Sequence, residues 1–333
     1  MKGSKRITIV LGAVFLAIFA WAVPSLAEYP EKPVQLLVGY PPGGSSDASA
    51  RALVEAVKPF FPMSIAVVNK PGGSGVLMTN EVIHSAPNGY TLGQVSGSML
   101  TIAPNLDNSL PYKGPGDLQF IISCARGQDG IAVRADSPWK TMKELIDYAK
   151  ANPGKVRIGC SGIGGSPHFS ALSLYRGGIK EFTFVPFTGG GPAITALLGG
   201  HIEAVTNNTM PFLPHVQAGK LRLLALFAEE RNTMVPELKD VPTFKELGYK
   251  VLTIGTPYYI VAPKKTPQKV VDMLYDAFLK AETTDFYQKF CRNNLLLVEM
   301  KGAAQLAEET ENDFAYFRDF IEEMNLREML KKK

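Results

Sequence analysis

Short apolar runs alternate with amphipathic stretches from residue 33 to the C-terminal region. Strands are expected at residues 34–38, 64–68, 91–95, 120–123, 131–134, 156–159, 182–187, 202–206, 221–227, 251–254, 258–261 and 295–299. Between many of them, apolar positions recur every three or four residues, which is the pattern of an amphipathic helix. This alternation predicts an α/β fold in which sheets are flanked by helices.

Local signals set several helix boundaries. The sequence TMKE at 141–144 is a capping box that predicts a helix running to about Ala151. Ser166 and Pro167 are interpreted as the N-cap and first position of another helix. Two longer helices are expected after Pro267 and from about residue 303 to 324, and we interpret both as scaffold.

Four glycine-rich loops each follow an expected strand and precede an expected helix. The first lies in VGYPPGGSSDASAR at 38–51, and the others are NKPGGSG at 69–75, SGIGGS at 161–166 and TGGGP at 188–192. Small residues there let backbone N–H groups and a helix N-terminus face one point, which favours an anion. A purely structural turn is the alternative for any single loop. Four such junctions favour a ligand held by backbone amides.

Two breaks divide the chain into lobes. Residues 127–130 and 255–257 lie between expected strands, so the chain would cross between lobes twice. We expect lobe 1 to comprise residues 28–128 and 256–333, and lobe 2 residues 129–255. Two of the glycine loops fall in each lobe. A cleft between the lobes is the expected ligand site.

The first 27 residues predict a secretory signal peptide. Lys2, Lys5 and Arg6 precede a charge-free apolar run, and Ser25-Leu26-Ala27 suits a signal peptidase, with cleavage after Ala27. An uncleaved anchor is the alternative. Without the three basic residues the net charge falls from +4 to +1, so no nucleic-acid surface is expected.

Other chemistries find little support in the motifs. There is no P-loop, no Gly-x-Ser-x-Gly elbow and no His-Glu-x-x-His motif. Cys124, Cys160 and Cys291 are interpreted as buried free thiols, although one disulfide is possible. No metal and no cofactor are expected. His168 could be proposed as a base, but a structural hydrogen bond is the preferred interpretation.

Seven ordered stretches resemble the substrate-binding receptors of tripartite tricarboxylate transporters, also called Bug proteins. They are YPEKPVQLLVGYPPGGSSDASARAL at 29–53, VVNKPGGSG at 67–75, SAPNGYTLG at 85–93, KANPGKVRIGCSGIGGSPHFSA at 150–171, FTGGGPAITALLGGHIEA at 187–204, VPTFKELGY at 241–249 and IVAPKKTPQKVV at 260–271. The resemblance covers essentially the whole mature chain. It implies a periplasmic, two-lobed, Venus-flytrap binding protein, each lobe a mixed, mostly parallel sheet flanked by helices.

The resemblance also implies a function and a site. Such a receptor captures a small organic mono- or dicarboxylate, delivers it to integral-membrane transporter subunits and catalyses nothing; we expect a monomer. The expected ligand-binding residues are Tyr40, Gly43, Gly44, Ser45, Ser46, Asp47, Ser161, Gly162, Gly165, Ser166, Thr188, Gly189, Gly190, Gly191, Thr206 and Asn207.

Some of these residues have a second interpretation. Asp47 is expected to be an N-cap that reaches a ligand through water, with a local ion pair to Arg51 as the alternative. Asn208 joins Thr206 and Asn207 as a polar candidate, with turn-forming Asn as the alternative. Tyr40 stands where the family commonly has Phe, which adds a hydroxyl to the expected pocket.

Two other functions stay open. One is an exported sensor or adaptor that binds a ligand and docks on a membrane signalling protein. The other is an exported enzyme acting on a carboxylate, with His168 or Asp47 as base.

Overall fold

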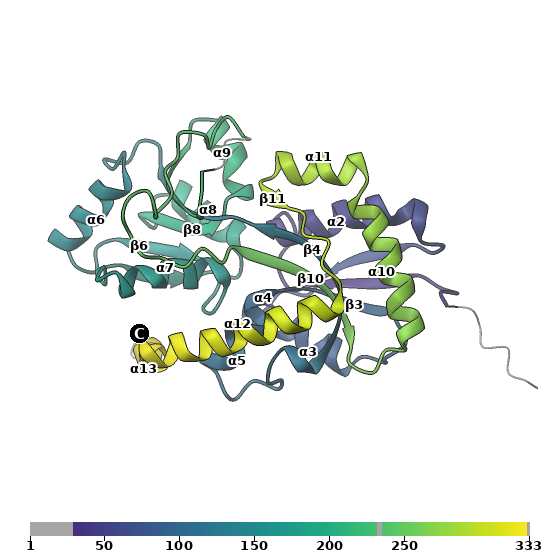
Figure 1. The fold of residues 1–333 in the computed structure, drawn as a ribbon. Coiled ribbons are helices and arrows are strands. Elements are labelled where there is room, and N and C mark those ends of the chain that lie inside the picture. Colours follow the sequence, from purple (N-terminus) through teal and green to yellow (C-terminus); the bar gives the residue numbers. More distant parts are fainter. Residues whose placement is uncertain (1–28, 232–234, 332–333) are drawn as a thin grey trace, which may run out of the picture. The chain divides into compact units, whose positions relative to one another are not determined.

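The computed structural model describes residues 29–231 and 235–331 (Figure 1). The expected signal peptide at residues 1–27 lies outside the described residues. Residues 32–333 form one unit, and the residues before it belong to a separate unit. The fold and site below lie within residues 32–333.

A six-stranded sheet organises lobe 1, in the order β11-β4-β10-β3-β1-β2. Its strands are β1 (Val34–Val38), β2 (Ile65–Asn69), β3 (Thr91–Ser96), β4 (Leu118–Gly127), β10 (Thr256–Pro263) and β11 (Leu296–Leu297). A five-stranded sheet organises lobe 2, in the order β7-β6-β8-β5-β9. Its strands are β5 (Asp129–Arg134), β6 (Arg157–Cys160), β7 (Thr183–Pro186), β8 (Ala204–Asn208) and β9 (Leu221–Phe227). The chain thus leaves the first sheet after β4 and returns to it with β10.

Helices flank both sheets. They are α2 (Ser45–Val57), α3 (Val76–His84), α4 (Gly97–Thr101), α5 (Ala103–Leu106), α6 (Met142–Ala151), α7 (Ser166–Arg176), α8 (Gly190–Leu198), α9 (Leu213–Gln217), α10 (Gln268–Glu282), α11 (Asp285–Asn293), α12 (Ala303–Glu323) and α13 (Leu326–Lys331). Short 3₁₀ turns are found at Lys58–Phe60, Gly73–Gly75, Pro115–Asp117 and Met210–Phe212. The α/β class expected from the hydrophobic pattern is therefore confirmed.

Both sheets are mixed, as the sequence predicted. Strands that precede glycine loops pair in parallel: β1 with β2 and β3, and β6 with β7 and β8. The strands next to the crossovers pair antiparallel: β10 with β3 and β4, and β5 with β8 and β9. Parallel pairs do not predominate, because the crossover strands β4, β10 and β5 are interior strands that run antiparallel to both neighbours.

The second sheet is buried on both faces, which explains its continuous apolar strands. In β5, Ile131 and Val133 pack with α6 and α7, whereas Ala132 packs with α8 and α9 on the opposite face. Successive side chains of a strand point to opposite faces, so one short strand supplies both core clusters. The glycine loops therefore begin from a rigid support.

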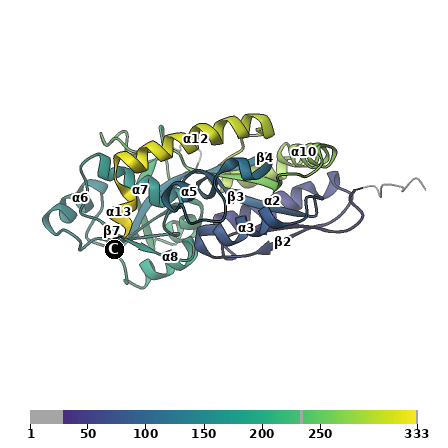
Figure 2. The same cartoon turned by 90° about the horizontal axis from the view of Figure 1, so that it is seen from below.

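Helix α12 reaches from one sheet to a helix of the other (Figures 1 and 2). Its N-terminal part packs on the first sheet through Leu306. Its C-terminal part packs on α7, where the rings of Phe317 and Phe169 meet edge to face with centroids 5.8 Å apart. Arg176 and Glu323 form an ion pair of 3.0 Å at the end of this contact. The helix is thus a scaffold element shared by both sheets.

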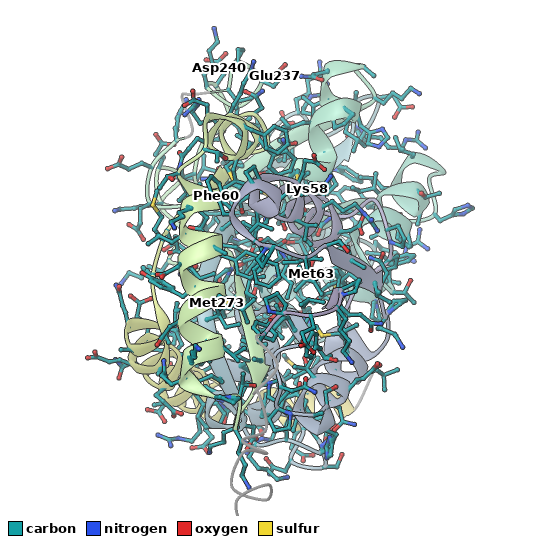
Figure 3. All side chains as sticks on the ribbon, turned by 90° about the vertical axis from the view of Figure 1, so that its right-hand side faces the viewer. Lys58, Phe60, Met63, Glu237, Asp240 and Met273 are labelled. Carbon is teal, nitrogen blue, oxygen red and sulfur yellow. The ribbon has the colours of Figure 1, made fainter. Side chains whose placement is uncertain are left out.

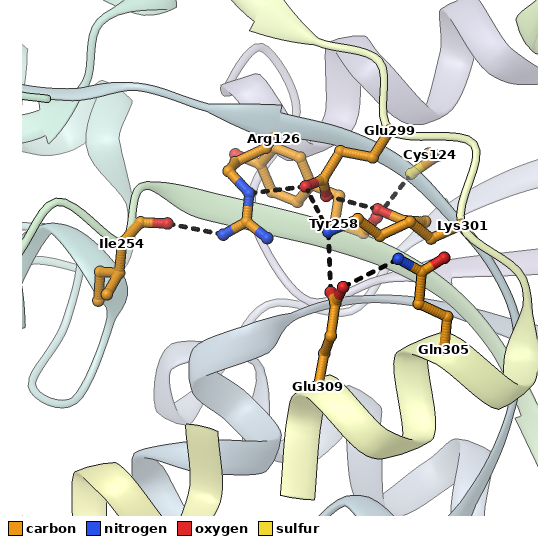
Figure 4. Close-up of polar contacts among 9 residues, drawn as sticks. Cys124, Arg126, Ile254, Tyr258, Glu299, Lys301, Gln305 and Glu309 are labelled. Carbon is orange, nitrogen blue, oxygen red and sulfur yellow. Dashed lines mark hydrogen bonds and ion pairs between the residues drawn. The ribbon is translucent and has the colours of Figure 1, made fainter. Parts of the chain in front are cut away.

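The strand expected at residues 251–254 is wrong, because the backbone there makes no sheet ladder. The guanidinium of Arg126 donates to the Ile254 carbonyl at 2.7 Å and to Glu299 at 3.0 Å, as Figure 4 shows. Lys301 joins Glu299 and Glu309 to the same network. A side chain rather than a neighbouring strand therefore holds the segment that leads into β10. The strand expected at 295–299 is reduced to β11, and Leu295 is excluded from it by a positive φ of 60°.

Helix boundaries follow the local signals in most places. Thr141 accepts from the Glu144 N–H and Glu144 accepts from the Thr141 N–H, so the capping box of α6 is confirmed. The cap of α7 is one residue earlier than expected: Gly165 is the N-cap and Ser166 is already helical, because the strand-to-helix turn closes within the glycines.

Two exposed apolar side chains lie at one end of lobe 1. Phe60 and Met63, which follow α2, have exposed fractions of 39% and 36%, and Met273 of α10 lies nearby in Figure 3.

Among residues 29–231 and 235–331, no helix is both long and apolar enough to cross a membrane.

Candidate functional site

The first glycine loop is shaped by the carboxylate of Asp47. One oxygen accepts from the Gly43 N–H at 3.0 Å, and the other accepts from Arg51 and Asn69, each at 2.9 Å. Gly43 has a φ of 84°, a conformation that side chains rarely adopt, so a glycine is required there. Gly44 is the N-cap, so the interpretation of Asp47 as N-cap is wrong. Asp47 lies in the first turn and organises the loop, and the expected ion pair with Arg51 is confirmed.

The environment of Asp47 favours its charged form. Burial alone would raise the pKa of this carboxyl, but hydrogen bonds from Arg51, Gly43 and Asn69 hold the pKa below its ordinary value. We therefore expect Asp47→Ala to lower the free energy of unfolding at pH 7 by about 1–3 kcal/mol, since it leaves three donors without their acceptor. Because the folded pKa is lowered, the stabilisation is present above the unfolded pKa and is lost as pH falls through the folded pKa.

Urea unfolding of wild type and Asp47→Ala at pH 7 and at pH 3 measures this difference. Arg51→Ala, which removes only one of the three donors, is the matched comparison. An equal loss of stability at both pH values would contradict an ionic role for Asp47.

Three helix N-termini converge on one cavity. The first intrahelical bonds are donated by Ala48 in α2, Phe169 in α7 and Ala193 in α8. The N–H groups before them lack intrahelical acceptors, as at every helix start. They belong to residues 45, 46 and 47 of α2, 166 and 168 of α7, and 190 and 191 of α8. Amides and helix dipoles from both lobes therefore present positive potential to the same small volume.

The cavity brings together most of the residues expected to bind a ligand. Its lining includes Tyr40, Gly44, Ser45, Ser46, Ser161, Ser166, Gly189, Gly190, Gly191 and Asn207. About 50 Å³ is accessible to the centre of a water molecule, which matches a few waters or a small organic molecule. Every lining residue is uncharged: they are Ser, Thr, Asn, Tyr, Gly and Pro. Any anion there would be held by dipoles and not by a cation.

The other expected residues lie outside the lining and hold the loops. Thr206 is buried and donates to the Pro167 carbonyl at 3.0 Å, which fixes the start of α7. Gly162 has a φ of 104° and packs against Ser74 of lobe 1. Gly165 caps α7, and Thr188 is exposed before α8. Gly43 and Asp47 shape the first loop, as described above.

Several contacts join the lobes around the cavity. Ser45 Oγ donates to Asn208 Oδ1 at 3.2 Å, and Ser74 Oγ donates to the Ile163 carbonyl at 3.1 Å. Asn208 and Asn207 lie in β8, so they are strand residues and not the turn formers considered as the alternative. The amide of Asn208 packs over Gly127 at the first crossover, where a Cβ atom would come within 1.6 Å of Nδ2.

The sequence interpretation missed residues that line the cavity from strand ends. Ser96 ends β3, and Thr256 and Tyr258 begin β10. The antiparallel register pairs Tyr258 with Ser96, which places both residues at the end of the sheet that borders the cavity. A polar residue directly after the expected strand 91–95 could have indicated Ser96. Nothing in the local sequence indicates the register of β10.

Burial keeps the two tyrosines of the cavity lining neutral near pH 7. It raises the pKa of Tyr40 to about 12 and that of Tyr258 well above the ordinary value. Behind the lining, burial raises the pKa of Asp129 to about 7, although hydrogen bonds from Thr256 and Ser170 oppose this effect. The lining is therefore polar and uncharged, and the Asp129 carboxyl behind it is partly ionised at pH 7.

His168 has a structural role in the glycine loop of lobe 2. Its Nδ1 accepts from the Gly164 N–H at 3.2 Å, and the residue is fully buried outside the cavity lining. The expected structural hydrogen bond is confirmed. Within the described residues, no group of three His, Cys, Asp or Glu side chains could hold a metal ion, and the three cysteines are buried free thiols as expected.

The chain forms two lobes, each a mixed sheet flanked by helices, and residues of both lobes line the cavity. This architecture defines a periplasmic solute-binding fold. Residues 50–326 match the model of the tripartite tricarboxylate transporter family receptor, and the chain belongs to this family. The resemblance inferred from the seven sequence stretches is thereby confirmed. Members of this family are solute-binding receptors.

Three similar proteins illustrate the match. The UPF0065 protein in the gbd 5' region of Cupriavidus necator is 37% identical over 282 residues, which cover 84% of this chain and 84% of that protein. A solved structure of a periplasmic transporter is 31% identical, with a TM-score of 0.84 and coverage of 89% of this chain and 98% of its own. MatC from Rhodopseudomonas palustris, solved with bound malate, is 26% identical, with a TM-score of 0.81 and coverage of 87% and 99%.

Proposed function

We propose that the protein captures a small organic mono- or dicarboxylate in the cavity and delivers it to a membrane transporter. The observation that carries the proposal is the convergence of three helix N-termini on one cavity with an uncharged lining. Amide donors fixed by helices can satisfy a carboxylate without a buried cation, whose desolvation would be costly while the site is empty. The malate in MatC is consistent with this ligand class.

Two further parts of the proposal concern the lobes and the compartment. The ligand is enclosed by a hinge motion of lobe 1 relative to lobe 2. Lobe 1 comprises residues 28–128 and 256–333, and lobe 2 comprises residues 129–255. The mature protein is a periplasmic monomer that begins after Ala27. Mass spectrometry of the exported protein tests cleavage after Ala27. Light scattering of the purified protein tests the monomeric state.

Binding itself is tested by a thermal-shift screen. The protein is stripped of ligand by unfolding and refolding and is then mixed with aliphatic and aromatic C3 to C8 carboxylates. A hundredfold excess over the dissociation constant should stabilise the folded state by about 2.7 kcal/mol, because ligand binds only that state. Stabilisation by sugars or cations, with no response to any acid, would contradict the proposal. Co-purification with the membrane subunits tests delivery, and capture of a membrane kinase instead would favour the sensor alternative.

An enzymatic role has little support from the site. The oxygens of Asp47 are occupied by three donors outside the cavity lining, and His168 Nδ1 accepts from the backbone. Neither group is placed to take a proton from a molecule in the cavity. Incubation with the best-binding acid, followed by mass spectrometry, tests for turnover.

A further inference from the structure

Four hydroxyl groups at the cavity have their protons committed to acceptors of the protein. We call them the hydroxyl cluster: Tyr40, Ser45, Ser46 and Thr256. Tyr40 Oη donates to the Ser74 carbonyl at 3.1 Å, and Thr256 Oγ1 donates to the Asp129 carboxyl at 2.9 Å. A hydroxyl that donates its only proton inside the protein can only accept from a ligand.

The direction of the Ser46 hydrogen bond follows from a buried chain of partners. Ser49 Oγ donates to the Ser46 carbonyl at 3.1 Å, so Ser49 must accept from Gln94 Nε2, at 2.9 Å. The same Nε2 faces the Cys124 sulfur, whose own proton goes to the Tyr258 carbonyl at 3.1 Å. Both neighbours of Nε2 therefore accept, which fixes the amide orientation and leaves Oε1 of Gln94 facing Ser46 at 3.1 Å.

Turning the Ser46 proton toward a ligand would be unfavourable. Gln94 is fully buried, and its Oε1 would then lose its donor. A buried acceptor without a donor destabilises the folded state. The Ser45 hydroxyl likewise donates its proton inside the protein, to Asn208 Oδ1. The Met210 N–H donates to the same oxygen, which fixes the orientation of the Asn208 amide.

The opposite wall of the cavity has a different polarity. Ser161, Ser166 and Asn207 line it, and the described residues form no hydrogen bond with their side chains. Backbone N–H groups at the start of α8 add further donors on that side. Two further hydroxyls of the lining contact the cluster and not the lobe 2 wall, because Ser96 is hydrogen-bonded to Tyr40 and Tyr258 to Ser45. A bound molecule thus meets free donors at the helix N-termini and on the lobe 2 side, and acceptors at the hydroxyl cluster.

Building on the proposed function, we propose that the ligand is a hydroxy acid, whose carboxylate faces the helix N-termini and whose hydroxyl donates to the hydroxyl cluster. A second carboxylate against the cluster would place acceptor against acceptor. An ammonium group there would be a buried charge, and no lining residue carries a formal negative charge to pair with it. A neutral hydroxyl is the group that fits.

Pairs of acids that differ by one hydroxyl test this inference. Dissociation constants are measured by calorimetry on refolded, ligand-free protein for malate and succinate, for lactate and propionate, and for 3-hydroxybutyrate and butyrate. We expect the hydroxylated member of the best-binding pair to bind about tenfold more tightly, as one added hydrogen bond implies. Equal or tighter binding of the deoxy acid overturns the inference alone. Absence of binding by every acid overturns the proposed function and the inference with it.

Variants assign the preference to the hydroxyl cluster. Tyr40→Phe and Ser46→Ala each remove one acceptor, and we expect the tenfold ratio to fall to about threefold or less in the double variant. The matched control is Tyr148→Phe, which removes an exposed hydroxyl of α6. An unchanged ratio in folded variants overturns the assignment. Tyr40→Phe keeps the ring in place, so it provides the test should Ser46→Ala fail to fold.

Discussion

Replacing Gly190 by valine is expected to weaken ligand binding about a hundredfold, since small displacements of a binding group have effects of this size. Gly190 is the first residue of α8 and lines the cavity. A Cβ atom there would lie 2.0 Å from Nδ2 of Asn207 and 2.8 Å from its Cγ. Asn207 is buried, so either its amide moves into the cavity or α8 withdraws from it. Calorimetry with the acid that gives the largest thermal shift measures the loss.

Gly191→Val is the matched comparison for this prediction. Gly191 is the next residue of the same helix turn, but a Cβ atom there meets nothing within 4 Å. We expect a much smaller loss of affinity, with both variants folded by circular dichroism. Equal losses in the two variants would show that the collision with Asn207 is not the cause.

Replacing Glu282 by methionine is expected to stabilise the protein at pH 7 by roughly 3 kcal/mol. Glu282 ends α10 in a fully buried position, and its carboxyl oxygens have no hydrogen-bond partner among the described residues. Burial raises its pKa to about 9, against a smaller opposing effect of the Met300 backbone. Methionine fills a similar volume without a group that ionises when the chain unfolds.

The sign of the pH dependence distinguishes ionisation from packing. Because the folded pKa is raised, the folded state holds a proton that the unfolded state has already released between about pH 4.5 and pH 9. Wild-type stability therefore falls across this window as pH rises, and the advantage of Glu282→Met grows with it. Urea unfolding at pH 4, 7 and 8 measures the difference, with the exposed Glu322→Met of α12 as control. A constant advantage at every pH would indicate improved packing instead.

The glycine loops show how far a sequence can identify a site. Gly43, Gly162 and Gly164 have positive φ values, and the sequence marks such positions because only glycine adopts them without strain. The loops at 38–51, 161–166 and 188–192 indeed meet at one cavity. The sequence interpretation placed Asp47 at the N-cap, whereas it lies in the first turn of α2 and accepts from the Gly43 N–H. Both positions favour an acidic residue at a helix start, so the sequence does not distinguish them.

The loop at 69–75 marks a limit of the same reasoning. It too follows a strand and precedes a helix, but its Ser74 contacts the Ile163 carbonyl and Gly162 instead of lining the cavity. A local motif records the turn geometry of its own segment. It does not record which other segment comes to lie against it.

Local chemistry was therefore determined by the sequence alone: the strand-glycine-helix turns, the capping box at Thr141, the amphipathic helices and the family. Tertiary structure decided which polar groups meet. Ser96 reaches the cavity because β10 pairs antiparallel with β3, and Gln94 fixes the proton of Ser46 because two segments far apart in the chain pack together. Sheet register and side-chain hydrogen bonds depend on distances between remote residues, and no local pattern specifies those distances.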